Sequence, residues 1–137
     1  MTREEAIEFI KKVHIGYLAT IDTDNKPQVR PVAMDTFYGD DLYFFTFCTT
    51  RKVAEMAAHP QVEVVWVSME ANMTQVRLSG RAAVVTDEAV KQRFKDDNPK
   101  VAELLPPGAE QLFQLYKVTP EKVEVAEGLV PYEVIAW

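Results

Sequence analysis

Residues 46–56 of the sequence read TFCTTRKVAEM, and this segment is the most informative in the chain. The strand-like residues 42–45 lead into it, and a short helix-like run over residues 53–58 follows. Thr49 or Thr50 is suited to the N-cap of that helix, because a threonine hydroxyl can satisfy an unpaired amide of the first turn. The segment therefore predicts a strand, a threonine-rich turn and a helix.

The first turn of this helix would contain two cations, Arg51 and Lys52. The positive end of the helix dipole repels cations, and acidic residues are usually found there. The conflict disappears if an anion sits at the helix start, held by free amides, hydroxyls and the two basic side chains. The pattern predicts a phosphate-binding turn, and the alternative is a solvated Arg-Lys pair on a surface helix.

Length and composition predict one domain over residues 1–137, with a full hydrophobic core. The chain is 47% hydrophobic and 26% charged, and its formal net charge is −6. This charge argues against a general nucleic-acid binder and against a membrane-surface binder. Several basic residues in or beside strand-like segments could still converge on one anionic site: Arg30, Arg51, Lys52, Arg77 and Arg81.

The single cysteine, Cys48, excludes an internal disulfide and fits a reducing compartment. We expect it to be a small buried hydrophobic residue, with a reactive thiolate as the alternative. His14, His59 and Cys48 are too far apart for a recognised metal motif, so no metal site is predicted. No apolar run has the length of a membrane span, and residues 1–5 lack the layout of a secretory signal. The expected location is cytoplasmic.

Hydrophobic periodicity and turn residues predict a mainly β protein with flanking short helices. Thr2 and Glu5 have capping-box spacing at the start of a helix over residues 3–13. Pro31 indicates an edge strand or a bulge, because proline cannot donate to the sheet. The expected strands are 15–21, 28–34, 42–47, 62–67, 76–85, 112–118 and 123–126, and a helix capped by Thr86 covers 88–95. Frequent turns favour an antiparallel barrel or sandwich.

Six segments together resemble the FMN-binding split-barrel family, often called pyridoxamine phosphate oxidase-like. They occur in the family's order, at residues 16–22, 27–32, 44–52, 59–62, 75–80 and 116–124. The resemblance implies a six-stranded antiparallel Greek-key split barrel. It also implies a homodimer with two FMN sites at the subunit interface. No GxSxG, P-loop or GxGxxG motif is present, so a serine hydrolase, a P-loop NTPase and a Rossmann dehydrogenase are unsupported.

The resemblance also implies roles for individual residues. Arg30 would face the phosphate or ribityl part of the flavin, and Phe45 and Thr46 would pass beside the isoalloxazine ring. Gln75 matches a position that reaches a flavin held mainly by the other subunit in several members. The phosphate would be held by Thr50, Arg51 and Lys52, and the cofactor-binding set is completed by Pro31, Val32 and Thr49.

Departures from the family pattern argue against true pyridoxamine phosphate oxidase activity. Asp35 stands where the vitamin-synthesising oxidases have a basic residue, and Ala126 lies near the position of their flavin-approaching tryptophan. Residues 128–137 are an apolar tail ending in Trp137, which would pack on the partner subunit or cover the flavin. The expected function is an FMN-dependent oxidoreductase of unknown substrate, like the short general-stress members. The alternatives are a non-catalytic flavin-binding, electron-transfer or stress protein, and a deazaflavin- or haem-binding relative.

Overall fold

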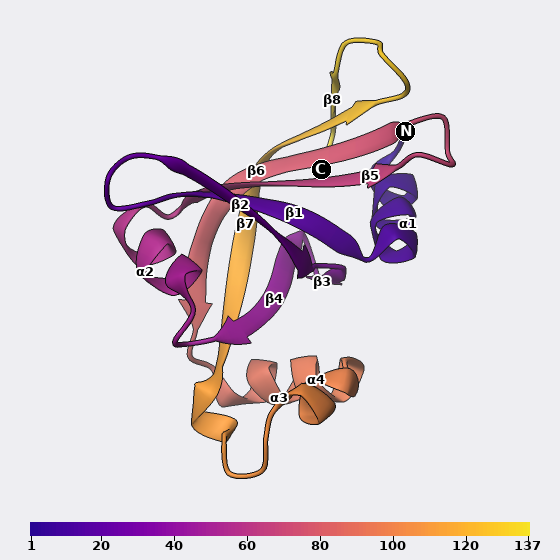
Figure 1. Ribbon diagram of the computed structural model, residues 1–137. Coiled ribbons are helices and arrows are strands. Elements are labelled where there is room, and N and C mark those ends of the chain that lie inside the picture. The colour runs from indigo at the N-terminus through magenta and orange to yellow at the C-terminus, as the bar shows by residue number, and fades with distance from the viewer.

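Eight antiparallel strands form one curved sheet in the computed structural model, which describes residues 1–137 (Figure 1). The order across the sheet is β2-β1-β5-β6-β7-β4-β3, and β8 pairs with β7. The strands are β1 (Ile15–Ile21), β2 (Pro27–Ala33), β3 (Thr36–Tyr38), β4 (Asp41–Phe47), β5 (Gln61–Ser68), β6 (Thr74–Val85), β7 (Phe113–Ala126) and β8 (Glu133–Ile135). The helices are α1 (Arg3–Val13), α2 (Arg51–Ala58), α3 (Glu88–Asp97) and α4 (Lys100–Leu104), with a 3₁₀ turn at Glu110–Leu112.

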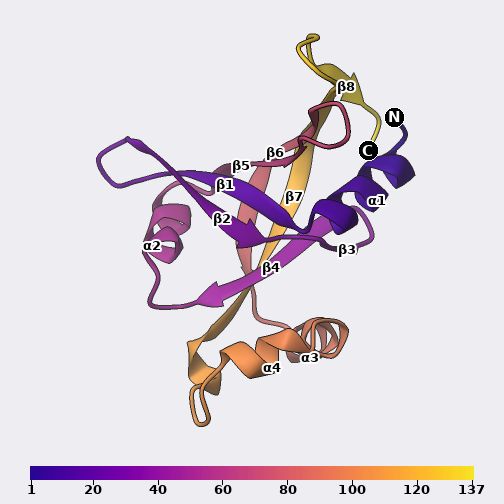
Figure 2. The ribbon, with the colours of Figure 1, turned by 45° about the vertical axis from the view of Figure 1, so that its right-hand side comes forward.

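The predicted mainly β, antiparallel class is confirmed, and the strand count is eight instead of six or seven. Six strands have seven or more residues, whereas β3 and β8 have three each. In Figures 1 and 2, β1 and β2 cross the long strand β7 steeply, and the sheet curls around the main core, a cluster of 17 buried residues. A second cluster comprises Phe94, Val101, Phe113 and Leu115. No helix is long and apolar enough to cross a membrane.

The core lies on the concave side of this sheet, where alternate residues of neighbouring strands meet. Leu18 of β1 pairs with Val64 of β5, and Val64 pairs with Leu78 of β6. All three side chains are fully buried. Because directly opposed residues in an antiparallel pair point to the same face, these registers define one continuous apolar layer. The other face of β1, β5 and β6 therefore points outward.

Local signals predict the starts of α1, α2 and α3 within two residues, but only the cap of α1 is as predicted. The Thr2 side chain accepts the Glu5 amide at the start of α1, as the capping-box spacing predicts. The Thr86 cap was wrong, because Asp87 caps α3 and accepts from the amides of Ala89 and Val90. Pro31 lies in β2, which is an edge strand as predicted.

The predicted break between residues 112–118 and 123–126 is wrong, because β7 is one strand of 14 residues. Pro120 is accommodated by a register shift, in which Ser79 pairs with Lys122 and Gly80 pairs with Pro120. A Cβ atom at position 80 would clash with the Thr119 carbonyl oxygen. The glycine thus permits the close approach that carries β7 past its proline.

Candidate functional site

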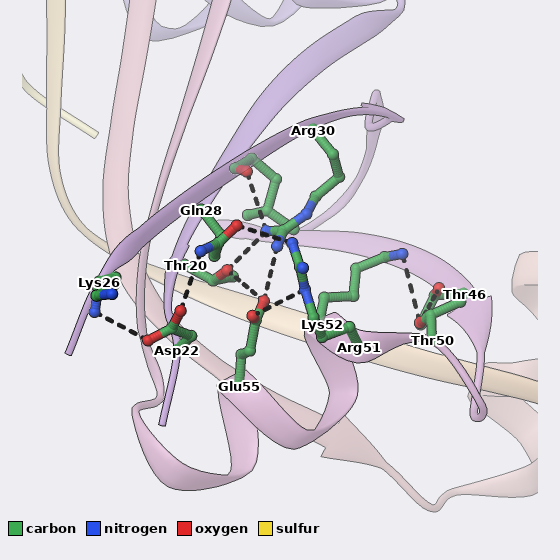
Figure 3. Close-up of polar contacts among 11 residues, drawn as sticks. Thr20, Asp22, Lys26, Gln28, Arg30, Thr46, Thr50, Arg51, Lys52 and Glu55 are labelled. Atoms are coloured by element: carbon green, nitrogen blue, oxygen red, sulfur yellow. Dashed lines mark hydrogen bonds and ion pairs between the residues drawn. The ribbon is translucent and has the colours of Figure 1, made fainter. Parts of the chain in front are cut away.

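The start of α2 and the adjacent parts of β1, β2 and β4 form a polar cluster, the α2 corner (Figure 3). Besides α2, the strands β1, β2 and β4 contribute side chains to this cluster, because the β1–β2 hairpin and the end of β4 flank the helix. The α2 corner consists of Thr20, Arg30, Thr46, Thr50, Arg51, Lys52 and Glu55. The sequence-predicted residues Arg30, Thr46, Thr50, Arg51 and Lys52 are thereby brought together.

Thr50 is the N-cap residue of α2, but its hydroxyl makes no capping hydrogen bond. The hydroxyl instead donates to the Phe47 carbonyl oxygen at 2.9 Å and lies 3.0 Å from the Thr46 hydroxyl. No acidic residue occupies the first turn. The predicted side-chain cap is therefore wrong. The Val53 amide donates to the Thr50 carbonyl oxygen at 3.2 Å, and no side chain caps the amides of the first turn.

Glu55 is the buried centre of the α2 corner, with 2% of its side chain exposed. Its Oε1 accepts from the Thr20 hydroxyl at 2.8 Å and from Arg30 Nη2 at 2.7 Å. Arg30 Nη1 also donates to the Thr20 hydroxyl and to the Leu18 carbonyl oxygen. These bonds fix the Arg30 guanidinium, since a buried carboxylate is stable only when paired and hydrogen-bonded.

Arg51 lies across the surface of the corner and is 71% exposed. Its Nε is 3.3 Å from Glu55 Oε2, an oxygen that accepts no hydrogen bond. Its Nη2 donates to Gln28 Oε1 at 2.8 Å, and Gln28 Nε2 donates to Asp22 at 3.0 Å. The Lys26 amide is the main cause that holds the pKa of Asp22 below its usual range. This relay ties Arg51 to the β1–β2 turn.

Lys52 is the cation of the corner that has no ion pair. Its Nζ lies 3.4 Å from the Thr50 hydroxyl. Burial, and then the nearby charge of Arg30, lower its pKa, and Glu55 partly opposes this. Burial makes the charged form of this ammonium less favourable, and no carboxylate offsets that cost by an ion pair. An added anion would favour the charged form.

Sequence reasoning missed Glu55 and Thr20. The available signal was a glutamate four residues after Arg51, a spacing that places both side chains on one face of a helix. That signal does not indicate burial, because an exposed pair has the same spacing. Thr20 had no signal of its own, since a threonine in a half-buried strand is ordinary.

The remaining predicted residues lie apart from the corner. Phe45 stacks on Phe113 with ring centroids 5.6 Å apart, in the aromatic cluster beneath α3. Val32 packs against the main core, Pro31 is exposed on β2, and Thr49 is exposed in the turn after β4.

Cys48 is exposed, so the expectation of a buried cysteine is wrong. It follows β4, and its Sγ lies 3.7 Å from the Gln111 carbonyl oxygen. The alternation of a strand no longer directs a side chain inward once the strand has ended.

Gln75 lies on the opposite face of the sheet from Arg30. Arg30 pairs with Leu18, which belongs to the core-facing layer, so the Arg30 side chain is on the core side of the sheet. Gln75 alternates in β6 with the buried residues Thr74 and Val76, so its side chain is on the outward side. Arg77 shares this outward face and is linked through Val65 to Tyr17 of β1. Side chains of one strand alternate between faces. Arg30 and Gln75 of one chain therefore face different spaces.

A groove of about 330 Å³ lies between the ends of β2 and β4 and the helices α3 and α4. His14 Nδ1 and Asp35 Oδ2 are 2.8 Å apart on one side of it. Asp97 and Lys100 line the other side, and Phe45 is among the apolar lining residues. Sequence reasoning predicted no metal site at His14 and did not anticipate its nearness to Asp35, which arises only because α1 ends beside β2.

Fold and corner together define a split-barrel protein with a cationic helix start. The family model for pyridoxamine 5'-phosphate oxidase matches residues 2–126. The chain belongs to this family, and the resemblance seen in the sequence is confirmed.

Curated relatives extend well beyond this chain. It is 33% identical over 89 residues to the pyridoxine/pyridoxamine 5'-phosphate oxidase of Rhodopseudomonas palustris strain BisB5. This match covers 64% of the chain and 40% of the relative. The match thus spans less than half the length of that relative, and it does not show that this chain has the relative's activity.

Solved structures share the fold at low identity. A NimC/NimA family protein from Clostridium acetobutylicum matches with a TM-score of 0.81 and 24% identity, over 96% of this chain and 89% of that one. An FMN binding protein from Nostoc punctiforme has a TM-score of 0.68 and 17% identity, over 91% and 84%. The heme storage protein HutZ from Vibrio cholerae has a TM-score of 0.74 and 19% identity, over 94% and 99%. Neighbours of this fold thus include both an FMN binder and a heme binder.

Proposed function

We propose that this protein binds FMN in a homodimer and acts as an oxidoreductase. One observation carries the proposal: the α2 corner gathers three cations at a helix start that has no side-chain cap and no acidic first-turn residue. A phosphate monoester is the ligand that such a corner fits, because amides, hydroxyls and guanidinium groups all donate to its oxygens. When bound, FMN would supply the hydride or electron transfer.

Charge balance supports a phosphate dianion in the corner. Arg30, Arg51 and Lys52 contribute three positive charges and Glu55 one negative charge, which gives a net +2. A phosphate monoester carries about −1.5 to −2 at neutral pH. Glu55 would keep Arg30 in place, while Arg51, whose own side chain is 71% exposed, would turn toward the ligand. Lys52 would gain the anionic partner that it lacks.

The positions of Arg30 and Gln75 support a dimeric site. They face opposite sides of the sheet, so both can serve one flavin only if Gln75 comes from a second copy. The outward face of β1 and β2 supports such a contact, because its alternate residues are all apolar. We call this the outer face: Ile15, Tyr17, Ala19, Ile21, Pro27, Val29, Pro31 and Ala33. An exposed apolar face of this kind is typical of a protein–protein contact.

The groove beside Phe45 supports turnover of a second substrate. Under the family resemblance Phe45 passes beside the flavin ring, and the groove opens next to it. Its charged lining includes two aspartates, Asp35 and Asp97, beside Lys100 and His14. A phosphate-bearing substrate would meet these carboxylates, so the groove does not favour pyridoxamine phosphate. The natural substrate would be neutral or cationic.

The test is a parallel titration with FMN and riboflavin, which differ only in the phosphate. Flavin fluorescence quenching and the absorption spectrum report binding, and sedimentation reports the dimer. We expect saturation near one FMN per chain and at least about 100-fold weaker riboflavin binding, because the charge-assisted contacts are lost. Equal affinities would contradict the phosphate assignment. If FMN does not bind, the same titration would be repeated with a deazaflavin and with haem.

A further inference from the structure

The C-terminal tail returns over the outward face of β6 and contacts Gln75. After β7, the Gly128 amide donates to the Asn72 carbonyl oxygen at 2.8 Å, and β8 pairs with β7. Between these two anchors, the Tyr132 hydroxyl donates to Gln75 Oε1 at 2.6 Å. Both side chains are half-buried. The tail thus holds one end of an amide whose other end, Nε2, remains free.

The Tyr132 ring is itself held in place. The Arg77 guanidinium lies over it at 4.7 Å from the ring centroid, and Arg77 Nε is 3.4 Å from Glu63 Oε1. A guanidinium over an aromatic face is an attractive contact that restricts the ring. The hydroxyl therefore reaches Gln75 from a fixed direction.

Trp137 shows where the rest of the tail goes. Its Nε1 donates to the Asp40 carbonyl oxygen at 2.9 Å, and its ring packs on Phe37 and beneath Arg3. The end of the tail thus packs against its own chain. Of the tail's aromatic side chains, only Tyr132 hydrogen-bonds a residue of the proposed site.

We propose that Tyr132 is a positioning residue that orients the Gln75 amide toward the flavin of the partner subunit. This inference rests on the proposed function. With Oε1 occupied by the tyrosine hydroxyl, Gln75 can offer only its two N–H donors. Its target on a flavin is then an acceptor, such as a ring carbonyl oxygen. Without the hydroxyl, the amide could rotate and present its oxygen to that acceptor.

A double-mutant cycle tests the coupling. Tyr132→Phe removes only the hydroxyl and keeps the ring beneath Arg77, Gln75→Ala removes the amide, and the third variant combines both. We expect Tyr132→Phe to weaken FMN binding about tenfold, the size of one hydrogen bond made effective by orientation. In the Gln75→Ala background the same change should have almost no effect, because nothing is left to orient.

A matched control is available in Tyr38. Its hydroxyl also donates to an acceptor at 2.6 Å, Asp97 Oδ2, and Arg93 lies 3.9 Å from its ring centroid. Tyr38→Phe should leave FMN affinity and the flavin absorption bands unchanged. Tyr132→Phe should shift those bands and the flavin midpoint potential, which a merely structural loss would not do.

Gln75→Glu tests the donor assignment separately. The carboxylate still accepts from Tyr132 but offers no donor to a flavin acceptor, so FMN affinity should fall as much as in Gln75→Ala. Parent-like affinity of Gln75→Glu or of Tyr132→Phe would overturn the inference. Equal losses from Tyr132→Phe in both backgrounds would do the same. If the parent binds no FMN, the proposed function fails; if it binds FMN and the cycle is additive, only the role of Tyr132 fails.

Discussion

The α2 corner and the outer face are the two halves of the proposed site, and they are built in opposite ways. The corner buries a carboxylate and an arginine of one chain in a hydrogen-bonded network. The outer face exposes apolar side chains, of which Val29 is 68% exposed, and the Gln75 amide lies on the same side of the sheet. Under the proposed function, the phosphate-binding half is assembled within one chain, whereas Gln75 would reach the flavin only from a second copy.

The largest expected effect is a difference in stability between removing a buried carboxylate and removing an exposed one. Glu55→Ala should lower the free energy of unfolding by about 3 kcal/mol, because it leaves the Arg30 guanidinium without its buried partner. Glu63→Ala, which removes an exposed partner of Arg77 on the outward side, should cost less than about 1 kcal/mol. Urea unfolding of both variants measures the difference. Equal losses of unfolding free energy would mean that Glu55 contributes no more to stability than a residue of an exposed ion pair does.

The next effect concerns ligand binding by the corner. Replacing Arg51 and Lys52 together by alanine should weaken FMN binding by about 3 kcal/mol, because two charge-assisted phosphate contacts are lost. The fold should survive, since both cations oppose the helix dipole in the absence of an anion. Riboflavin titration is the control, because a ligand without phosphate should not sense the change. Parent-like FMN affinity in the double variant would show that the phosphate lies elsewhere.

Sequence reasoning succeeded where the signal was local and failed where tertiary contacts decided. Residues 46–56 contain the strand end, the turn and the helix start, so the gathering of Thr50, Arg51 and Lys52 could be predicted. The burial of Glu55 could not, because it depends on Thr20 and Arg30 arriving from the β1–β2 hairpin.

The β7 strand and the tail show the same limit. Pro120 is the local signal that predicted a strand end, but the register shift at Gly80 on the neighbouring strand lets β7 continue past it. The contact of Tyr132 with Gln75 spans 57 residues of sequence, and no periodicity encodes it. These features depend on contacts between residues that are far apart in the sequence.

The outer face provides the third prediction. Val29→Asp would place a charge at the centre of the proposed dimer contact and should weaken association by about 2 kcal/mol, because the carboxylate loses water without gaining a partner. Val84→Asp is the control, since Val84 is 49% exposed on β6 and lies outside the outer face. Sedimentation measures both.

FMN affinity should fall together with dimer population in Val29→Asp if Gln75 of the partner completes the site. A dimer that resists Val29→Asp would show that the dimer contact lies outside the outer face, and a monomer that retains full affinity would confine the site to one chain. Either result would remove the contrast between the two halves.

The smallest expected effect tests the charge of Lys52. Burial and Arg30 hold its pKa below the ordinary value of 10.5, so its charged form costs free energy in the folded protein. That cost is present at neutral pH and is relieved as the pH rises through the lowered pKa. A bound phosphate favours the charged form and raises the pKa again. FMN affinity should therefore fall, by at most about tenfold per pH unit, as Lys52 of the free protein deprotonates.

FMN titrations between about pH 7 and 10 measure this dependence against a Lys52→Arg control, because arginine stays charged throughout. Titration of the flavin itself affects both proteins equally and cancels in the comparison. The parent should lose affinity before the arginine variant does. Superimposable profiles would mean that the Lys52 charge does not contribute to phosphate binding, and would assign the corner's anion affinity to its two arginines and the helix amides alone.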